Sequence, residues 1–106
     1  MIKYIVDLKI NSSIYDEFLL WLSEHVHEIL CLDGFTNAEI YEESDLNINN
    51  EIRQLIVNYE LTSRQHLQNY FDNHATNMRN KTTEMFGNNV IASRRIFSIK
   101  KVINKS

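Results

Sequence analysis

The feature that most constrains this chain is an internal echo. Segment 21–29 reads WLSEHVHEI and segment 70–78 reads YFDNHATNM, so an aromatic residue, an apolar residue and a histidine recur at the same spacing. A short strand-like pattern and a hydroxyl residue precede each segment at the same offset. Residues three and four apart are neighbours on a helix surface. The echo therefore predicts a chain made of two versions of one strand–helix unit.

Strand patterns complete the two units. Segments 2–10 and 52–61 alternate apolar and polar residues, which is the period of a β-strand with one buried face. Segments 35–43 and 90–102 are predicted as two further strands. The asparagine-rich stretch 45–50 is predicted as the loop of a hairpin.

Two helices lie between these strands. Segment 14–30 collects its apolar residues on one arc at helical spacing, with Ser13 as the predicted N-cap and Gly34 as the closing residue. A second helix is predicted from Thr62 to about Phe86, loosened at 80–83. Thr62 would cap it, and Gln65 would complete a capping box.

The element order β-α-β-β-α-β predicts an α+β fold of the ferredoxin-like type. Right-handed crossovers then give a four-stranded antiparallel sheet with both helices on one face and the first and third strands in the centre. The 106 residues contain no proline and no linker-like tract. We therefore expect a single domain over residues 1–103, with 104–106 frayed.

Composition excludes several classes of protein. The longest apolar run, 18–22, is far too short to span a membrane. The chain starts directly with a strand pattern instead of a secretory signal, so we expect a cytoplasmic location. Cys31 is the only cysteine, which rules out an internal disulfide. Two glycines form no phosphate-binding loop, so we predict no nucleotide cofactor and no other cofactor.

The sheet face that the helices leave uncovered presents isoleucines among polar residues. Ile5 and Ile56 lie near its middle, and no aromatic residue points outward from the two central strands. Single-stranded RNA is bound on such sheets by exposed aromatics, so we predict no nucleic-acid partner. An apolar patch rimmed by polar groups is typical of a protein interface, and we predict a homodimer through Ile5 and Ile56.

Basic residues dominate the end of the chain. Five of them and no acid follow Ser93, although the net charge is −3. A basic strip can bind a polyanion. We favour a solvated edge strand whose lysines discourage aggregation, because the strip is short and the whole chain is acidic.

The segment 24–28, EHVHE, is rich in metal-binding side chains. On a helix, however, His25 and His27 point about 200° apart and cannot hold one ion together. Pairs three residues apart serve metals only when several facing helices supply partners. We predict no metal site.

The echoed aromatic–histidine pairs are the candidate site. Each histidine borders an apolar arc, where an imidazole can serve a ligand at a pocket mouth and an aromatic ring can stack on it. The alternative is a structural histidine that hydrogen-bonds a backbone carbonyl. A cation from the last strand could join the site, depending on register. The candidate ligand-binding residues are Trp21, His25, Tyr70, His74, Arg94 and Arg95.

The element order together with segments 21–26, 34–35, 73–75 and 86–87 resembles a family of small uncharacterised bacterial domains. That family is similar to the dimeric α+β barrel group, which includes antibiotic-biosynthesis monooxygenases. The resemblance implies a homodimer with a pocket between sheet and helices for a small apolar or aromatic ligand. Two hypotheses stay open: a small-ligand protein, including a cofactor-free monooxygenase or isomerase, and a non-catalytic homodimeric interaction module.

Overall fold

A computed structural model describes residues 1–44 and 51–106 of the chain, so the predicted loop 45–50 lies outside the described residues. Helices and strands follow in the order β1 (Ile2–Asn11), α1 (Tyr15–Leu30), β2 (Phe35–Glu42), β3 (Ile52–Leu61), α2 (Arg64–Asn73), α3 (Ala75–Phe86) and β4 (Val90–Ser98). Short 3-10 turns at Ser12–Ile14 and Gly87–Asn89 precede α1 and β4.

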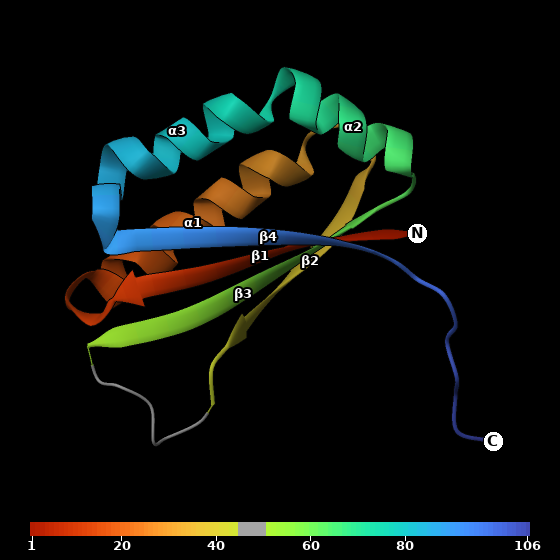
Figure 1. Ribbon diagram of the computed structural model, residues 1–106, viewed down its shortest axis with the longest axis horizontal. Helices are drawn as coiled ribbons and strands as arrows, with labels where there is room; N and C mark the ends of the chain where they lie inside the picture. Colours follow the sequence, from red (N-terminus) through yellow and green to blue (C-terminus); the bar gives the residue numbers. More distant parts are fainter. Residues whose placement is uncertain (45–50) are drawn as a thin grey trace.

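The four strands form one antiparallel sheet in the order β2-β3-β1-β4. All three α-helices cover one face of this sheet (Figure 1). The predicted α+β, ferredoxin-like arrangement is confirmed, with β1 and β3 in the centre. The alternating strand pattern decides which face is covered, because the buried residues of the central strands, such as Leu8 and Leu55, all lie on the side under the helices.

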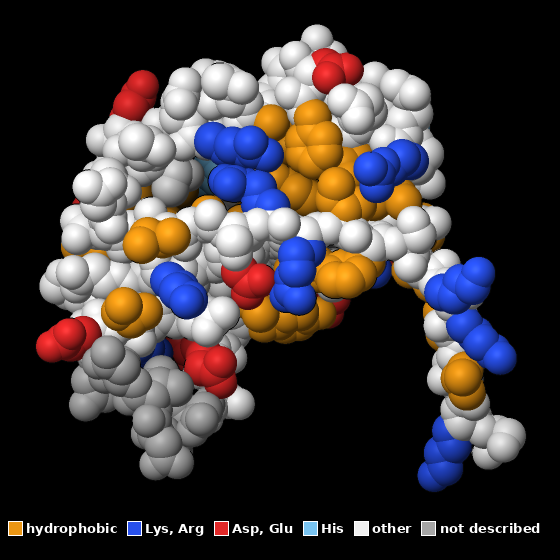
Figure 2. All heavy atoms as spheres, in the orientation of Figure 1, with side chains coloured by type: hydrophobic (Ala, Val, Ile, Leu, Met, Phe, Trp, Pro, Cys, Tyr) orange, Lys and Arg blue, Asp and Glu red, His pale blue; other side chains and the backbone are white. Residues whose placement is uncertain are grey.

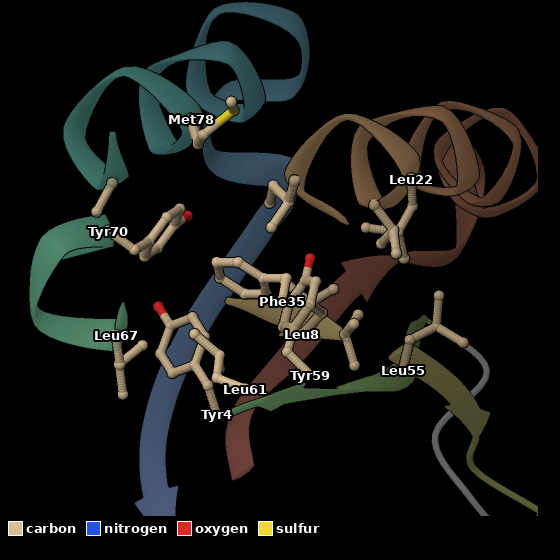
Figure 3. Close-up of a cluster of buried hydrophobic side chains, with 14 of the residues drawn as sticks. Tyr4, Leu8, Leu22, Phe35, Leu55, Tyr59, Leu61, Leu67, Tyr70 and Met78 are labelled. Atoms are coloured by element: carbon tan, nitrogen blue, oxygen red, sulfur yellow. The ribbon is translucent and has the colours of Figure 1, made fainter. Parts of the chain in front are cut away.

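The core lies between the helices and this covered face. Tyr4 and Leu8 of β1 and Tyr59 of β3 point towards Leu22 and Tyr70 on the helices (Figure 3). Its aromatic rings pack in two groups: Tyr4 stacks on Tyr59 with ring centroids 5.9 Å apart, and Phe18 packs edge-on against Phe86 at 5.1 Å. Phe18 and Leu67, from different helices, are completely buried.

The prediction of a single second helix is wrong, because the helix breaks at His74. The backbone there takes φ −132° and ψ −30°, and it separates α2 from α3. No loosening is found at 80–83, which lies inside α3. A continuous helix would place His74 on the same stripe as Leu67 and Tyr70. The break leaves His74 exposed and gives α3 a buried face of its own, with Ala75 and Met78.

The helix ends also differ from prediction. Ser63, not Thr62, caps α2: its Oγ accepts the His66 N–H at 3.2 Å. The predicted capping-box residue Gln65 instead bonds Asn69 one turn on. The second hydroxyl in a Thr-Ser pair can cap as well as the first, and sequence spacing does not choose between them.

The start and end of α1 differ in the same way. Asn11, not Ser13, provides the cap before it, by accepting the Ser13 N–H in the preceding 3-10 turn at 3.0 Å. Gly34 lies beyond the helix end at Cys31, with φ +86°. Its carbonyl accepts the Thr62 N–H, and an added Cβ would lie 2.3 Å from the His66 side chain. Glycine is thus required by close packing at this turn.

Candidate functional site: a cavity between sheet and helices

A cavity of about 280 Å³ lies between the sheet and helices α1 and α3. It opens beside β4, where Figure 2 shows a hollow under the helix layer with Lys and Arg side chains at its rim. The volume lies just below the range typical of small-molecule sites, roughly 300–1,000 Å³. The cavity therefore suits a small ring compound.

The cavity combines an apolar floor with polar groups from eight of its lining residues. Side chains from β1, β3, β4 and α1, including Val6, Leu22 and Val57, line the floor. The polar lining groups are those of Tyr4, His25, Tyr59, Tyr70, Arg79, Thr82, Thr83 and Arg94. Among the described lining residues none is acidic. Such a wall favours an apolar ligand with a hydrogen-bonding or acidic group.

Three tyrosines form the aromatic end of the cavity. Tyr4 lies between Tyr59 and Tyr70, with ring centroids 5.9 and 6.0 Å away. Burial raises the pKa of Tyr70 to about 12 and raises the pKa of Tyr59 as well. The positive charge of the nearby Arg94 lowers both pKa values and so offsets part of this rise. The phenols of Tyr59 and Tyr70 are therefore protonated at neutral pH and can donate hydrogen bonds to a ligand.

Two arginines supply positive charge at this wall. The Nη2 of Arg79 donates to the Tyr4 hydroxyl at 3.4 Å. Arg94 faces the cavity because it stands opposite Val6 in the strand register. Among the ion pairs of residues 1–44 and 51–106, neither arginine takes part. Both charges are available to an acidic ligand.

The strand register separates the two arginines that the sequence left as alternatives. Arg95 stands opposite Ile5 on the uncovered face of the sheet. There its Nη2 pairs with the Asp7 carboxylate at 3.1 Å. Adjacent residues of a strand point to opposite faces, so only Arg94 can contribute to the cavity.

His25 and Trp21 are in contact as predicted from their spacing. Their rings stack with centroids 4.6 Å apart and planes 17° apart. Trp21 also packs against Phe18 and Phe86, and it lines a shallow groove on the outer surface instead of the cavity. His25 lines both the groove and the cavity, so it forms the wall between them.

The environment of His25 is unusual for an imidazole. The residue is only 9% exposed, and its Nδ1 is buried with no hydrogen-bond partner among the described residues. Burial lowers the pKa of His25; Glu28 acts against this shift and Lys81 adds to it. The imidazole is therefore neutral at pH 7. A buried polar atom without a partner marks a place where a ligand or water can bind.

The second pair, Tyr70 and His74, does not repeat this geometry. Tyr70 is buried and lines the cavity, as does His25. His74 sits at the break between α2 and α3, is exposed, and lines a different surface depression with Cys31 and His66. The echo in sequence thus brings only one of the two histidines to the cavity.

Sequence reasoning missed Tyr4, Tyr59 and Arg79. The alternation of β1 and β3 already put both tyrosines on the covered face, so a count of polar groups on that face could have found them. Arg79 had no such signal, because its position depends on the helix break at His74.

Two further geometric findings concern the described parts of the chain. No group of three or more His, Cys, Asp or Glu side chains there is arranged to hold a metal ion. None of the described helices combines the length and the apolar character needed to cross a membrane.

Comparison with solved structures shows the same fold in proteins of low sequence identity. A candidate antibiotic biosynthesis monooxygenase from Deinococcus radiodurans is 12% identical, with a TM-score of 0.74 over 100% of this chain and 99% of that one. SnoaB, a cofactor-independent oxygenase from Streptomyces nogalater, is 8% identical, with a TM-score of 0.60 over 98% and 97% of the two chains.

The same comparison includes a designed protein. The de novo designed protein Foldit4 is 8% identical, with a TM-score of 0.59 over 93% of this chain and 98% of its own. The fold by itself therefore does not specify an oxygenase. A search of curated proteins finds no match.

A family match covers almost the whole chain. Residues 1–100 match the family described as Domain of unknown function (DUF4286). The match extends from β1 through β4, so it includes every element that builds the cavity. The chain is a member of the DUF4286 family with the fold of the antibiotic-biosynthesis-monooxygenase-like proteins.

Proposed function

We propose that this protein binds a small, mainly apolar ring compound with an acidic group in the cavity between sheet and helices. The observation that carries the proposal is the composition of the cavity wall: an apolar floor, two arginines and no described acidic residue. A carboxylate or phenolate would lie between Arg79 and Arg94, since charge-assisted hydrogen bonds are the strongest available there. The ring would lie against Tyr4 and Leu22.

His25 supports a second candidate function, acid–base chemistry on the bound molecule. Its imidazole is neutral, buried and without a partner at Nδ1 among the described residues, which suits a general base. A cofactor-free oxygenation or an isomerisation begins with such a proton transfer. Binding alone leaves a bound compound unchanged, whereas catalysis gives a product that mass spectrometry detects.

Titration calorimetry with 2-naphthoate tests the binding proposal, with neutral 2-naphthalenemethanol as the control ligand. Arg94→Gln should weaken 2-naphthoate binding roughly 10- to 100-fold, because it removes a charge-assisted contact of about 1.5–3 kcal/mol. Binding of the neutral ligand should change little.

Arg95→Gln is the matched control, since Arg95 is the next residue on β4 and points to the other face. It should leave 2-naphthoate affinity unchanged. Equal affinity of wild type and Arg94→Gln for 2-naphthoate, or no binding by wild type at millimolar concentration, would contradict the proposal.

We also propose that two copies pack through the uncovered sheet face. Ile5 and Ile56 are half-buried near its centre, and Tyr41 and Phe97 on the edge strands add exposed apolar surface. Much of the charge on this face is already paired, as in the Lys3–Glu60 bridge of 2.8 Å. Paired charges around apolar residues lower the cost of covering the face with a second copy.

A further inference from the structure

The mouth of the cavity carries two positive charges that come from different elements. Arg79 belongs to α3 and Arg94 to β4, and both line the cavity. β4 ends at Ser98, earlier than the predicted end at 102, and Arg94 lies in the middle of the strand where the register fixes its face. Figure 2 shows Lys and Arg side chains at the rim of the hollow under the helix layer.

The phenol of Tyr70 shows that the two guanidinium groups are close to one point. Burial raises the pKa of Tyr70 to about 12, and the charges of Arg79 and Arg94 each act to lower it. Charges more than about 8 Å apart are largely screened at physiological ionic strength. Arg79 is further fixed by its 3.4 Å bond to the Tyr4 hydroxyl and by the Phe71 ring, whose centre is 6.0 Å from the guanidinium carbon.

Within the described parts of the protein, neither positive charge is neutralised. The ion pairs there leave out both arginines. The lining includes no described acidic residue, and His25 is neutral because burial lowers its pKa. A monoanion would leave one of the two charges uncompensated, whereas a dianion can pair with both. Charge complementarity therefore favours a ligand with two negative charges.

A free hydroxyl group stands on the same wall. Thr82 of α3 is half-buried and lines the cavity, and its hydroxyl makes no hydrogen bond among the described residues. The neighbouring Thr83 instead donates its hydroxyl to the Arg79 carbonyl at 3.3 Å. A phosphate monoester has three terminal oxygens that accept hydrogen bonds, and a carboxylate has two. The phosphate can thus accept from both arginines and from Thr82.

We propose that the acidic group of the ligand is a phosphate monoester, which Arg79, Arg94 and Thr82 hold at the mouth while the apolar part fills the floor. This inference rests on the proposed binding of an acidic ring compound in the same cavity. Both arginine side chains are exposed, so the phosphate stays in contact with water. Binding then avoids the high cost of burying two negative charges completely.

Titration calorimetry with 2-naphthyl phosphate, 2-naphthyl sulfate and 2-naphthoate tests the inference, at about pH 7.5 in a buffer free of inorganic phosphate. The phosphate ester is mainly a dianion there, because its second pKa is about 6. The sulfate ester has the same tetrahedral shape and a single charge. We expect the wild type to bind the phosphate ester roughly tenfold or more tightly than the sulfate ester, because the second charge adds a charge-assisted contact.

The ratio of the two dissociation constants is the measurement to compare among variants, since it does not depend on the fraction of folded protein. Arg94→Gln should bring this ratio close to one, because a single guanidinium pairs equally well with either ester. Arg95→Gln, whose side chain lies on the other face of the sheet, should keep the wild-type ratio. Thr82→Val should weaken phosphate binding roughly 2- to 10-fold, and Thr83→Val should weaken it less.

The three ligands separate this inference from the proposed function. If 2-naphthoate binds and the two esters bind with equal affinity, the phosphate class is wrong and the binding of an acidic ring compound stands. A preference for phosphate that survives in Arg94→Gln would also overturn the inference, because the second charge would then be recognised elsewhere. If none of the three ligands binds at millimolar concentration, both proposals are wrong.

Discussion

His25 is the residue whose surroundings demand the most explanation. Its ring is stacked on Trp21 and enclosed, yet Nδ1 has no hydrogen-bond partner among the described residues. Leaving a buried polar atom unpaired costs about 1–3 kcal/mol. The sequence alternative of a bond to a backbone carbonyl is not found at this atom. A ligand that bonds Nδ1 would recover this free energy on binding.

The lowered pKa of His25 predicts a pH-dependent stability. The unfolded chain binds a proton near pH 6.5, and the folded chain binds it only at lower pH. The free energy of unfolding should therefore fall as pH drops below about 6.5, by up to about 1.4 kcal/mol per pH unit from this group. His25→Gln should flatten the decline in urea-unfolding free energy measured from pH 7.5 to 5.5.

His27→Gln is the control for this measurement, because His27 is an exposed histidine of the same helix. It should keep the pH dependence of the wild type. An identical pH profile for His25→Gln and wild type would mean that His25 is accessible to solvent in the free protein.

The interruption between α2 and α3 is the decisive feature at the scale of elements. It turns His74 to the surface and allows α3 to bury Met78 while Arg79 reaches the cavity and the Tyr4 hydroxyl. The first copy of the repeat has one continuous helix, and α1 supplies His25. The two units of the chain thus share a fold and supply different groups to the same cavity.

The start of α2 offers a direct test of how this helix is held. Ser63→Ala removes the side chain that accepts the His66 N–H and should lower the free energy of unfolding by about 1 kcal/mol. Thr62→Ala, one residue earlier, removes a hydroxyl that lies 3.0 Å from the Nδ1 of His66 and caps no backbone N–H among the described residues, so it should cost less than about 0.5 kcal/mol. Urea unfolding of the two variants measures the difference. A larger loss of unfolding free energy for Thr62→Ala than for Ser63→Ala would indicate that Thr62 caps the helix.

The whole molecule has two unlike sheet faces. One is covered by three helices and encloses the cavity, and the other is open with charged pairs around half-buried isoleucines. The cavity opens beside β4 and not through the open face (Figure 2). Dimerisation through the open face would leave the entrance to the cavity free. Binding and assembly can therefore be tested separately.

Ile56→Asp should disrupt the proposed dimer, because it buries an unpaired carboxylate in the interface. We expect the dimer dissociation constant from sedimentation to rise roughly tenfold or more. Ile52→Asp is the matched control: it lies on the same strand and face but is 46% exposed near the hairpin end, so its effect should be smaller. An Ile56→Asp protein that remains as dimeric as wild type would put the interface elsewhere.

Local periodicity, together with the right-handed crossover rule, accounts for the sheet order and for which side chains are covered. Alternation in β1 and β3 assigned Tyr4, Leu8 and Tyr59 to the covered face and Ile5 and Ile56 to the open one, as the structure has them. The echo predicted the repeated unit and the contact between Trp21 and His25. These features follow from the backbone periods of strands and helices, which are visible in the order of neighbouring residues along the sequence.

The composition of the site depends on long-range packing. The strand register places Arg94, and not Arg95, at the cavity. The helix break keeps His74 away from the cavity and brings Arg79 to it. Packing buries the Nδ1 of His25. Each of these depends on contacts between residues far apart in the chain. The local sequence pattern is compatible with a continuous helix through His74. The helix breaks there because packing against the sheet buries a different face, and that packing cannot be read from the local periodicity.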